Sequence, residues 1–390
     1  MPDRLAELKR RLEEISDLRV AARVLDWDQM VMMPRGGAPV RAHHIATVRR
    51  LAHERFITDD VGELLEELAP LAESLPADDD DGCLIRVTRR DWEKARRIPP
   101  ALEAELSRVS SESMEAWASA REASDYAAFR PWLDRTLELK HRYVACFDAG
   151  DDPYDVLLDD FEPGMRTEEV RRVFDRLKPE LIELLRAAES GAEEAFVKGS
   201  YPLAAQEALS VELAQAFGFA TENFRLDPTV HPFCTSFGTQ DIRLTTRYAT
   251  DDLHGTSFFS TMHEVGHGLY EHGVDPRLDR TPLAEGCSSA LHESQSRLWE
   301  NVVGRSLPFW RWFYPRLRDA FSEKLSRASA TDTGSTERTS MSMSTATSAS
   351  TSTHMAGYRP LLPQPPTTNQ VALASKHRPI LPKSDFVPGK

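Results

Sequence analysis

The stretch Thr261-Met262-His263-Glu264-Val265-Gly266-His267-Gly268-Leu269-Tyr270-Glu271 contains the pattern H-E-x-x-H. On a helix, residues i and i+4 lie one turn apart on the same face, so the imidazoles of His263 and His267 can reach one metal ion. Glu264 lies next to that face, where its carboxylate can take a proton from a water molecule at the metal without being a ligand. Zinc lowers the pKa of such a water from about 16 to about 7 and polarises the carbonyl group that the water attacks. The stretch therefore predicts a helix that carries a hydrolytic metal site.

The residues around the pattern favour a buried helix, although the bare pattern also occurs by chance in ordinary helices. Ser257-Phe258-Phe259 and Leu269-Tyr270 supply an apolar frame. Gly273 follows the predicted last turn, where a C-cap glycine is common. This context strengthens the prediction of a metal site.

A catalytic zinc needs a third protein ligand, with the fourth position left to water. The next stretch with a helical pattern, Leu291 to Glu300, offers two adjacent candidates, His292 and Glu293. The residues themselves leave the choice between them open.

Composition and charge indicate the class of protein. At 390 residues the chain exceeds one ordinary core, so one large domain or two fused domains are expected. The formal net charge of −14 argues against nucleic acid as a partner. We find no signal peptide at Met1-Pro2-Asp3-Arg4, no apolar run near the roughly 20 residues of a membrane span, and no disulfide pattern among the four cysteines. We therefore expect a soluble cytoplasmic enzyme with no membrane partner.

Helical periodicity dominates most of the chain. Apolar residues recur every three or four positions from Leu5 to about Met30, and similar patterns cover roughly 40 to 75, 99 to 122, 126 to 145 and 203 to 217. The acidic run Asp78 to Gly82 predicts a solvated turn. A helix is expected to open at Thr167 with a capping hydroxyl. Its inward-facing side chains are predicted to be Val173, Leu177, Leu181, Leu184 and Leu185.

The pattern changes between Asp227 and Tyr248. Alternating, β-branched residues there predict strands or a hairpin with a turn at Gly238-Thr239. The exposed edge of a strand just before the metal helix could hold an extended peptide. Taken alone, Arg243 is more simply interpreted as one half of a structural ion pair with Asp241.

Four motifs stand in a fixed order along the chain. They are His231-Pro232-Phe233, then Asp241-Ile242-Arg243-Leu244-Thr245, then His263 to His267, then His292-Glu293-Ser294 before Trp299-Glu300-Asn301. In this order they resemble the carboxypeptidase Taq family of zinc metallopeptidases, the thermostable carboxypeptidase 1 family. The resemblance extends from Met1 to about Leu325.

The resemblance implies a mainly α, multi-helix zincin-like peptidase with a small β-sheet beside the H-E-x-x-H helix and a deep substrate groove. It implies a metallocarboxypeptidase that removes amino acids one at a time from the carboxyl ends of peptides, commonly as a homodimer. Zinc is the implied metal, with cobalt as the alternative.

The resemblance also implies roles for single residues. His263, His267 and Glu293 become the metal ligands, which decides the third ligand against His292, and Glu264 becomes the general base. Two further residues in family motifs, His231 and Arg243, are implied to touch the substrate.

After about Leu325 the chain departs from the family pattern. The family motifs I-R-x-x-A-D and G-x-x-Q-D-x-H-W do not occur, and a Ser/Thr-rich tract is followed by a Pro-rich one. Such composition cannot bury a core. We therefore expect a C-terminally incomplete catalytic domain in residues 1–327 and a disordered tail in residues 328–390, as from a frameshifted or truncated gene.

Three functional hypotheses follow. The first is an active metallocarboxypeptidase. The second is a truncated, inactive remnant that at most binds metal. The third is an aminopeptidase or endopeptidase with the same kind of metal site, although the chain has no recognisable motif for binding a free amino terminus.

Overall fold

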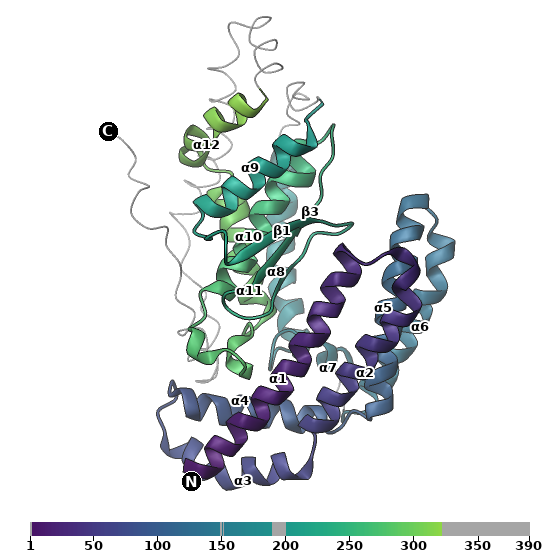
Figure 1. The fold of residues 1–390 in the computed structure, drawn as a ribbon, viewed down its shortest axis with the longest axis vertical. Coiled ribbons are helices and arrows are strands. Elements are labelled where there is room, and N and C mark those ends of the chain that lie inside the picture. Colours follow the sequence, from purple (N-terminus) through teal and green to yellow (C-terminus); the bar gives the residue numbers. More distant parts are fainter. Residues whose placement is uncertain (1, 149, 151, 189–199, 322–390) are drawn as a thin grey trace, which may run out of the picture. The chain divides into compact units, whose positions relative to one another are not determined.

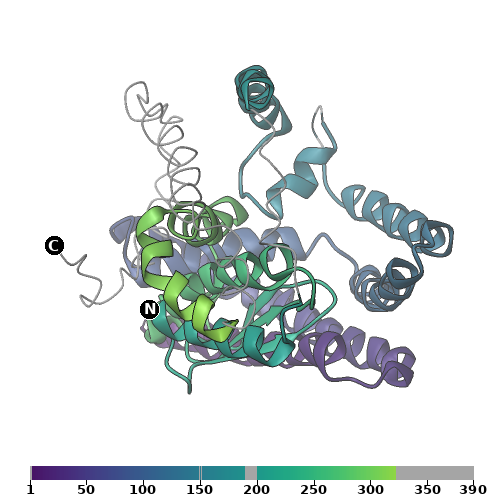
Figure 2. The ribbon, with the colours of Figure 1, turned by 90° about the horizontal axis from the view of Figure 1, so that it is seen from above.

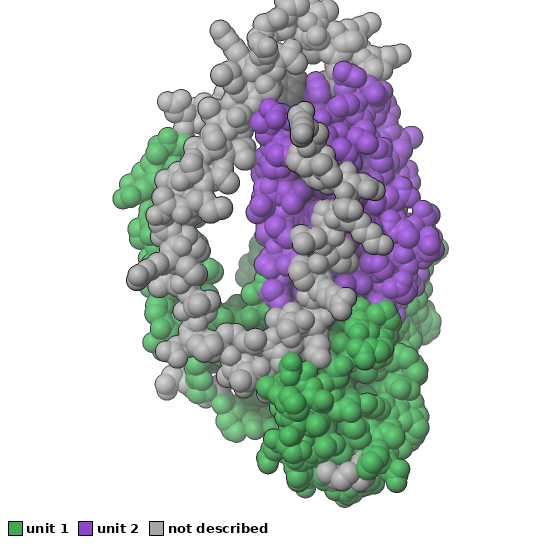
Figure 3. Space-filling model, turned by 90° about the vertical axis from the view of Figure 1, so that its left-hand side faces the viewer, with its two compact units in different colours: residues 1–190, 274–290, 369–376 green, residues 191–273, 291–368, 377–390 purple. Residues whose placement is uncertain are grey.

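The computed structural model describes residues 2–148, 150, 152–188 and 200–321. It is mainly helical with one small sheet (Figures 1 and 2), which confirms the predicted fold class. The chain divides into two compact units, one from residues 1–190 and 274–290 and the other from residues 191–273 and the part that begins at Leu291 (Figure 3). The domain limits 1–327 and 328–390 stay predictions, and the tail lies outside the described residues.

The first unit consists of helices. They are α1 (Pro2–Val31), α2 (Ala38–Phe56), α3 (Asp59–Ser74), α4 (Asp80–Ala95), α5 (Pro100–Ala123), α6 (Tyr126–Val144), α7 (Tyr154–Asp159) and α8 (Thr167–Ala187), with 3-10 turns at Arg35–Gly37, Pro276–Leu278 and Pro282–Ala284. Helix α1 packs on α2 and α3, and α5 lies between α2 and α6. The main core of this unit gathers Leu8, Phe56, Leu64, Leu68 and Ile85, all at most 2% exposed. The periodic apolar positions therefore predicted α1, α5 and α6 correctly, whereas the predicted stretch 40 to 75 is divided into two helices, α2 and α3.

The acidic run Asp78 to Gly82 is the start of a helix and not only a turn. Asp79 caps α4, because its side chain accepts a hydrogen bond from the backbone N–H of Gly82 at 3.0 Å. Asp80 and Asp81 then occupy the first turn of α4, where negative charge is stabilised by the helix dipole. A dense run of acidic residues is typical of a solvated loop, but the same residues are also typical of a helix N-terminus.

Helix α8 differs from the prediction in its surroundings. No residue of α8 is buried, and the side chains predicted to point inward are 45–66% exposed. The predicted capping hydroxyl is also wrong, since Arg166 is the N-cap residue and makes no side-chain capping bond. Periodicity decides which residues share a face of a helix, but it does not decide whether another element covers that face. We call the exposed side chains the α8 stripe, defined as Val173, Phe174, Leu177, Leu181, Leu184 and Leu185.

The second unit combines helices with the sheet. Its elements are α9 (Leu203–Ala216), β1 (Phe224–Pro228), β2 (Cys234–Ser236), β3 (Ile242–Thr246), α10 (Phe259–His272), the part of α11 (Ser289–Arg297) from Leu291 onward, and α12 (Leu307–Ala320). Two wider, π-helical turns adjoin these helices: η3 (Leu253–Phe258) leads into α10, and η6 (Leu298–Val303) continues α11. Helices α9 and α12 lie side by side in Figures 1 and 2.

The sheet has the strand order β1-β3-β2, with β3 parallel to β1 and antiparallel to β2. The predicted hairpin is confirmed: Phe237 donates its backbone N–H to the carbonyl oxygen of Asp241 at 2.9 Å, and Gly238 has a φ of 155° in the turn. The strand that precedes the metal helix is the central one, so the expectation that its edge is exposed is wrong. Among the described strands, β1 and β2 form the edges.

The packing of α10 on β3 orients the predicted metal helix. A Cβ atom on Gly268 would come within 2.8 Å of Leu244 and 3.0 Å of Ile242, so the glycine allows close approach to the strand. Met262, Val265 and Leu269 lie on the buried side of α10. Because this side is packed, the rotation of α10 is determined, and with it the directions of His263 and His267. None of the described helices has an apolar stretch long enough to cross a bilayer.

Candidate metal centre

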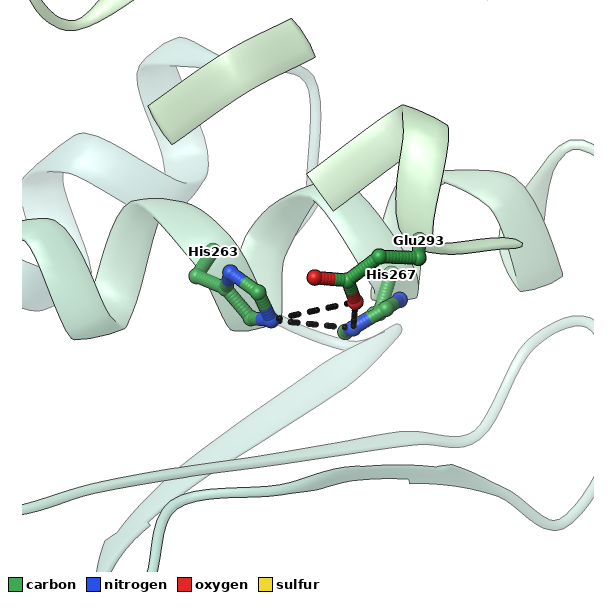
Figure 4. A group of neighbouring side chains, drawn as sticks. All are labelled: His263, His267 and Glu293. Atoms are coloured by element: carbon green, nitrogen blue, oxygen red, sulfur yellow. Dashed lines mark hydrogen bonds and ion pairs between the residues drawn. The ribbon is translucent and has the colours of Figure 1, made fainter. Parts of the chain in front are cut away.

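His263 and His267 lie one turn apart on α10, and their Nε2 atoms are 3.2 Å apart. The two rings meet edge to face, with centroids separated by 4.8 Å. Figure 4 shows both imidazoles directed at the same point as Glu293. The helical spacing therefore places two nitrogen donors as the sequence predicted.

Glu293 on α11 completes a group of three possible ligands. Its Oε2 atom lies 3.6 Å from Nε2 of His263 and 3.4 Å from Nε2 of His267 (Figure 4). Tetrahedral zinc, with ligand distances of about 2.0–2.2 Å, separates neighbouring ligand atoms by roughly 3.3–3.6 Å. The triangle of donor atoms therefore fits one face of such a coordination shell, and the donor set of two imidazoles and one carboxylate is suited to zinc.

His292, the other candidate for third ligand, contacts Nδ1 of His267, the ring nitrogen that faces away from the donor triangle. Its Nδ1 atom is 2.6 Å from Nδ1 of His267, and its Nε2 atom is 2.6 Å from Oε1 of Glu271. Both of its ring nitrogens are thus occupied by contacts outside the donor triangle. The geometry brings Glu293, and not His292, to the two Nε2 atoms.

Gly266 permits the close crossing of α10 and α11 that brings Glu293 to the histidines. A Cβ atom at this position would lie 2.6 Å from Cα of Ser296 and 2.7 Å from the carbonyl oxygen of Gln295. These are backbone atoms, so a side-chain movement cannot relieve the overlap. Gly266, the fourth residue of the H-E-x-G-H stretch, is therefore a packing requirement between the two helices that carry the candidate ligands.

We expect Gly266→Ala to destabilise the protein by about 1–3 kcal/mol, the typical cost of overpacking. Because the added methyl group separates α10 from α11, zinc affinity should fall as well. Urea unfolding and a zinc titration measure the two effects. Gly36→Ala is the matched control, since a Cβ atom there meets nothing within 4 Å. Unchanged stability in Gly266→Ala would contradict the close crossing.

Glu300 supports the site from the π-helical turn η6. Its Oε2 atom is 2.9 Å from Nδ1 of His263, an arrangement that orients the ring and leaves Nε2 free to bind metal. Arg297 links two carboxylates: it donates from Nε to Glu293 at 2.9 Å and from a terminal nitrogen to Glu300 at 3.1 Å. From the sequence, Glu300 is part of the Trp299-Glu300-Asn301 motif, but no role is predicted for it. Its spacing of seven from Glu293, two helical turns, is the signal that could have found it.

The charges around Glu293 favour its ionised form. Burial acts to raise the pKa of this carboxyl, but His263 and the hydrogen bond from Arg297 outweigh burial and hold the pKa below its usual value. An ionised carboxylate is the form that binds a metal ion.

Glu264 is buried beside the donor triangle, with 6% of its surface exposed. Burial, and then the charges of Glu293 and Glu300, raise its pKa to about 8. The pKa of the neighbouring thiol of Cys234 is also raised, first by burial and then by Glu264 and Glu271. A carboxyl group with a pKa near neutrality is suited to accepting and returning a proton at physiological pH.

His267 is held in its neutral form. Burial, and then His292 and His263, lower its pKa to about 4. A neutral imidazole has the lone pair that a metal ligand needs. In the folded protein His267 therefore needs no deprotonation to bind metal near neutral pH.

We expect the metal-free protein to lose stability as the pH rises from 6.5 to 8. A carboxyl with a pKa of 4.5 in the unfolded chain and about 8 in the folded protein keeps more protons in the folded state throughout this window. Stability then falls by about 1.4 kcal/mol per pH unit, or roughly 2 kcal/mol in total. Urea unfolding in chelator measures it.

Glu264→Gln is the control for this pH dependence, because glutamine does not titrate. An equal slope in this variant would assign the pH dependence to another group. His267 does not contribute to the pH dependence of stability between pH 6.5 and 8. Its pKa is lowered from 6.5 to about 4, so its contribution to stability is lost only as the pH falls through that lower range.

The two predicted substrate contacts lie on other parts of the second unit. Arg243 on β3 pairs with Asp241, at 2.5 Å and 3.0 Å, and its guanidinium lies over the ring of Phe237. The structural ion pair is therefore present. His231 is exposed in the loop that precedes β2. A substrate contact stays a prediction for both.

A sequence model of the carboxypeptidase Taq (M32) metallopeptidase family matches residues 7–339. The chain belongs to this family. Thermostable carboxypeptidase 1 of Thermus thermophilus is a similar relative, 39% identical over 332 residues, which are 82% of this chain and 64% of that protein. Carboxypeptidase 1 of Bacillus subtilis is 32% identical over 324 residues, again 82% of this chain and 64% of that protein.

Solved structures of family members share the fold. The M32 carboxypeptidase from Deinococcus radiodurans R1 is 34% identical, with a TM-score of 0.72 over 83% of this chain and 65% of that one. Pyrococcus furiosus carboxypeptidase is 35% identical, with a TM-score of 0.71 over 81% of this chain and 64% of that one. The chain thus spans less than two thirds of the length of these M32 relatives.

Proposed function

We propose that the chain is a zinc-dependent metallocarboxypeptidase that releases single amino acids from the carboxyl ends of peptides. The observation that carries the proposal is the donor triangle of His263, His267 and Glu293, with the buried acid Glu264 next to it. Membership of the M32 family, whose relatives are named carboxypeptidases, supports the choice of reaction. The donor set favours zinc, and cobalt is the alternative metal.

His263, His267 and Glu293 would hold the ion, with Glu300 and Arg297 keeping two of these side chains in position. Bound zinc supplies Lewis acidity, which activates water and polarises a carbonyl group. The protein's own contribution is a set of prearranged ligands.

Glu264 would act as general base and then as general acid. It takes the proton of the attacking water as the oxygen adds to the carbonyl carbon of the last peptide bond. When the C–N bond breaks, the same proton passes to the leaving amine. The raised pKa of about 8 suits both transfers. The positive charge of a bound metal would lower this pKa toward about 7, where the carboxyl can both accept and return a proton.

The proposal extends to the partners of the protein. Peptides are the substrates, and a homodimer is the proposed assembly. The net charge of −14 is unfavourable for nucleic-acid binding and suits the proposed cytoplasmic location. His231 and Arg243 are proposed as contacts to the substrate.

A second candidate is a metal-binding protein without peptidase activity. The observation that favours it is the coverage of 60–64% of the relatives' length, since groups that recognise substrate in the relatives can lie in the rest. In this case the protein binds zinc but releases no amino acid.

Peptides blocked at one end separate these functions. One peptide is N-acetylated and has a free carboxyl end, and a second peptide of the same sequence has a free amino end and a C-terminal amide. Each is incubated with zinc-loaded protein, with and without chelator. Chelator-sensitive release of free amino acids from the N-acetylated peptide alone supports a carboxypeptidase. Zinc binding without release supports the second candidate, and release that requires a free amino terminus supports an aminopeptidase.

A further inference from the structure

A chain of hydrogen bonds extends from His267 away from the donor triangle. Nδ1 of His267 is 2.6 Å from Nδ1 of His292, and Nε2 of His292 is 2.6 Å from Oε1 of Glu271. The hydroxyl of Ser236 donates to the other oxygen of Glu271 at 3.1 Å. The four side chains come from α10, α11 and β2, and all lie in the second unit.

With Glu271 ionised and His292 neutral, the hydrogen-bonding capacity of each group assigns the protons of this chain. An ionised carboxylate only accepts hydrogen bonds, so Nε2 of His292 must donate to Glu271. A neutral imidazole has one N–H, so Nδ1 of His292 carries a lone pair. The short contact between the two Nδ1 atoms then requires the hydrogen on His267. Nε2 of His267 is left with its lone pair, directed at Glu293 and His263.

We propose that Glu271 and His292 form a positioning relay that sets the tautomer and the ring orientation of His267. The inference rests on the proposed metal site and deepens it. Neither residue is a ligand or touches substrate in this account. They act through His267, as Glu300 acts on His263.

The two imidazoles of the site are thus supported differently. His263 meets a carboxylate directly, whereas a second imidazole separates His267 from its carboxylate. The ring of His292 also packs edge-on against Tyr270, with centroids 4.8 Å apart. A simple packing role for His292 is therefore the alternative to test.

Two substitutions of His292 separate the relay from packing. His292→Gln removes the ring but offers a side-chain oxygen that can accept from Nδ1 of His267. His292→Phe keeps the ring and the Tyr270 contact but removes the acceptor. Zinc affinity of the full chain is measured by competition with a chromophoric chelator, and thermal unfolding without metal reports folding. His272→Gln is the matched control, since this α10 histidine bonds to the carbonyl of Thr239 and not to the site.

The relay predicts that His292→Phe lowers zinc affinity about 10- to 100-fold, as for other groups that orient a ligand. His292→Gln should lose less, and His272→Gln should match the wild type. As a single substitution, Glu271→Gln should weaken zinc binding. In the His292→Phe background it should add little, because the two residues act in series. If the His292 variants fail to fold, the Glu271 variant and the nitrogen chemical shifts of His267 in metal-free wild type decide, with a protonated Nδ1 expected.

Retention of affinity in His292→Phe, equal losses in the Phe and Gln variants, or a His267 with unprotonated Nδ1 would each overturn the relay. Wild-type protein that binds no zinc would overturn the proposed function and the relay together. Wild-type protein that binds zinc but cleaves no peptide would contradict the proposed function alone, since the relay is judged by zinc affinity.

Discussion

Replacing Glu264 by glutamine is expected to lower the release of C-terminal amino acids by about 10²- to 10⁴-fold, the usual contribution of a general acid–base group. The variant keeps the shape of the side chain but cannot accept the proton of the attacking water. Because Glu264 is not one of the three candidate ligands, zinc affinity should stay within a few-fold of the wild type. Release of amino acids from an N-acetylated peptide and a zinc titration measure the two quantities.

The burial of Glu264 makes this expectation specific. The side chain is enclosed beside two other acids, so a neutral amide can replace it without leaving a charge uncompensated. Glu222→Gln is the matched control, because Glu222 is exposed in the turn before β1. Full activity in Glu264→Gln would assign the general base to another group.

Replacing Glu293 by alanine is expected to weaken zinc binding by about 10²- to 10⁴-fold. Apparent zinc-binding energies of about 10–16 kcal/mol, divided among a few ligands, assign several kcal/mol to each. The change removes one corner of the donor triangle and also one of the two carboxylate partners of Arg297. Peptidase activity at limiting zinc should disappear with the metal.

Glu300→Ala provides the comparison for Glu293→Ala. Glu300 contacts His263 and lies outside the donor triangle, so its loss should weaken zinc binding only about 10- to 100-fold. A larger loss in Glu300→Ala than in Glu293→Ala would mean that the third ligand is misassigned. Wild-type affinity in Glu293→Ala would exclude it as a ligand.

The parts of the fold that depend on local pattern could be predicted from the sequence. The i, i+4 histidines determine their own spacing on α10, and the turn around Gly238 determines the β2–β3 hairpin. The parallel pairing of β1 with β3 could not be predicted, because it joins Phe224–Pro228 to Ile242–Thr246 and no local pattern encodes such a contact. The exposure of the α8 stripe could not be predicted either, because periodicity does not show whether another element covers a helix face.

The motif of the candidate site could be predicted from the sequence, but the residues that orient its candidate ligands could not. Residue types left His292 and Glu293 open, since adjacent residues on a helix point about 100° apart and only the crossing of α10 and α11 decides which one faces the histidines. The contacts of Glu271 with His292 and Ser236 join three elements, so they depend on packing that sequence spacing does not reveal.

The α8 stripe has a consequence for the local stability of the protein. Packing supplies most of the stability of a helix in a folded protein, and none of the residues of α8 is buried. Backbone amides of α8 should therefore exchange their hydrogens with deuterium through local opening, well before those of α10, which is packed on β3. Slow exchange in α8, equal to that of α10, would mean that a second surface covers the stripe in solution.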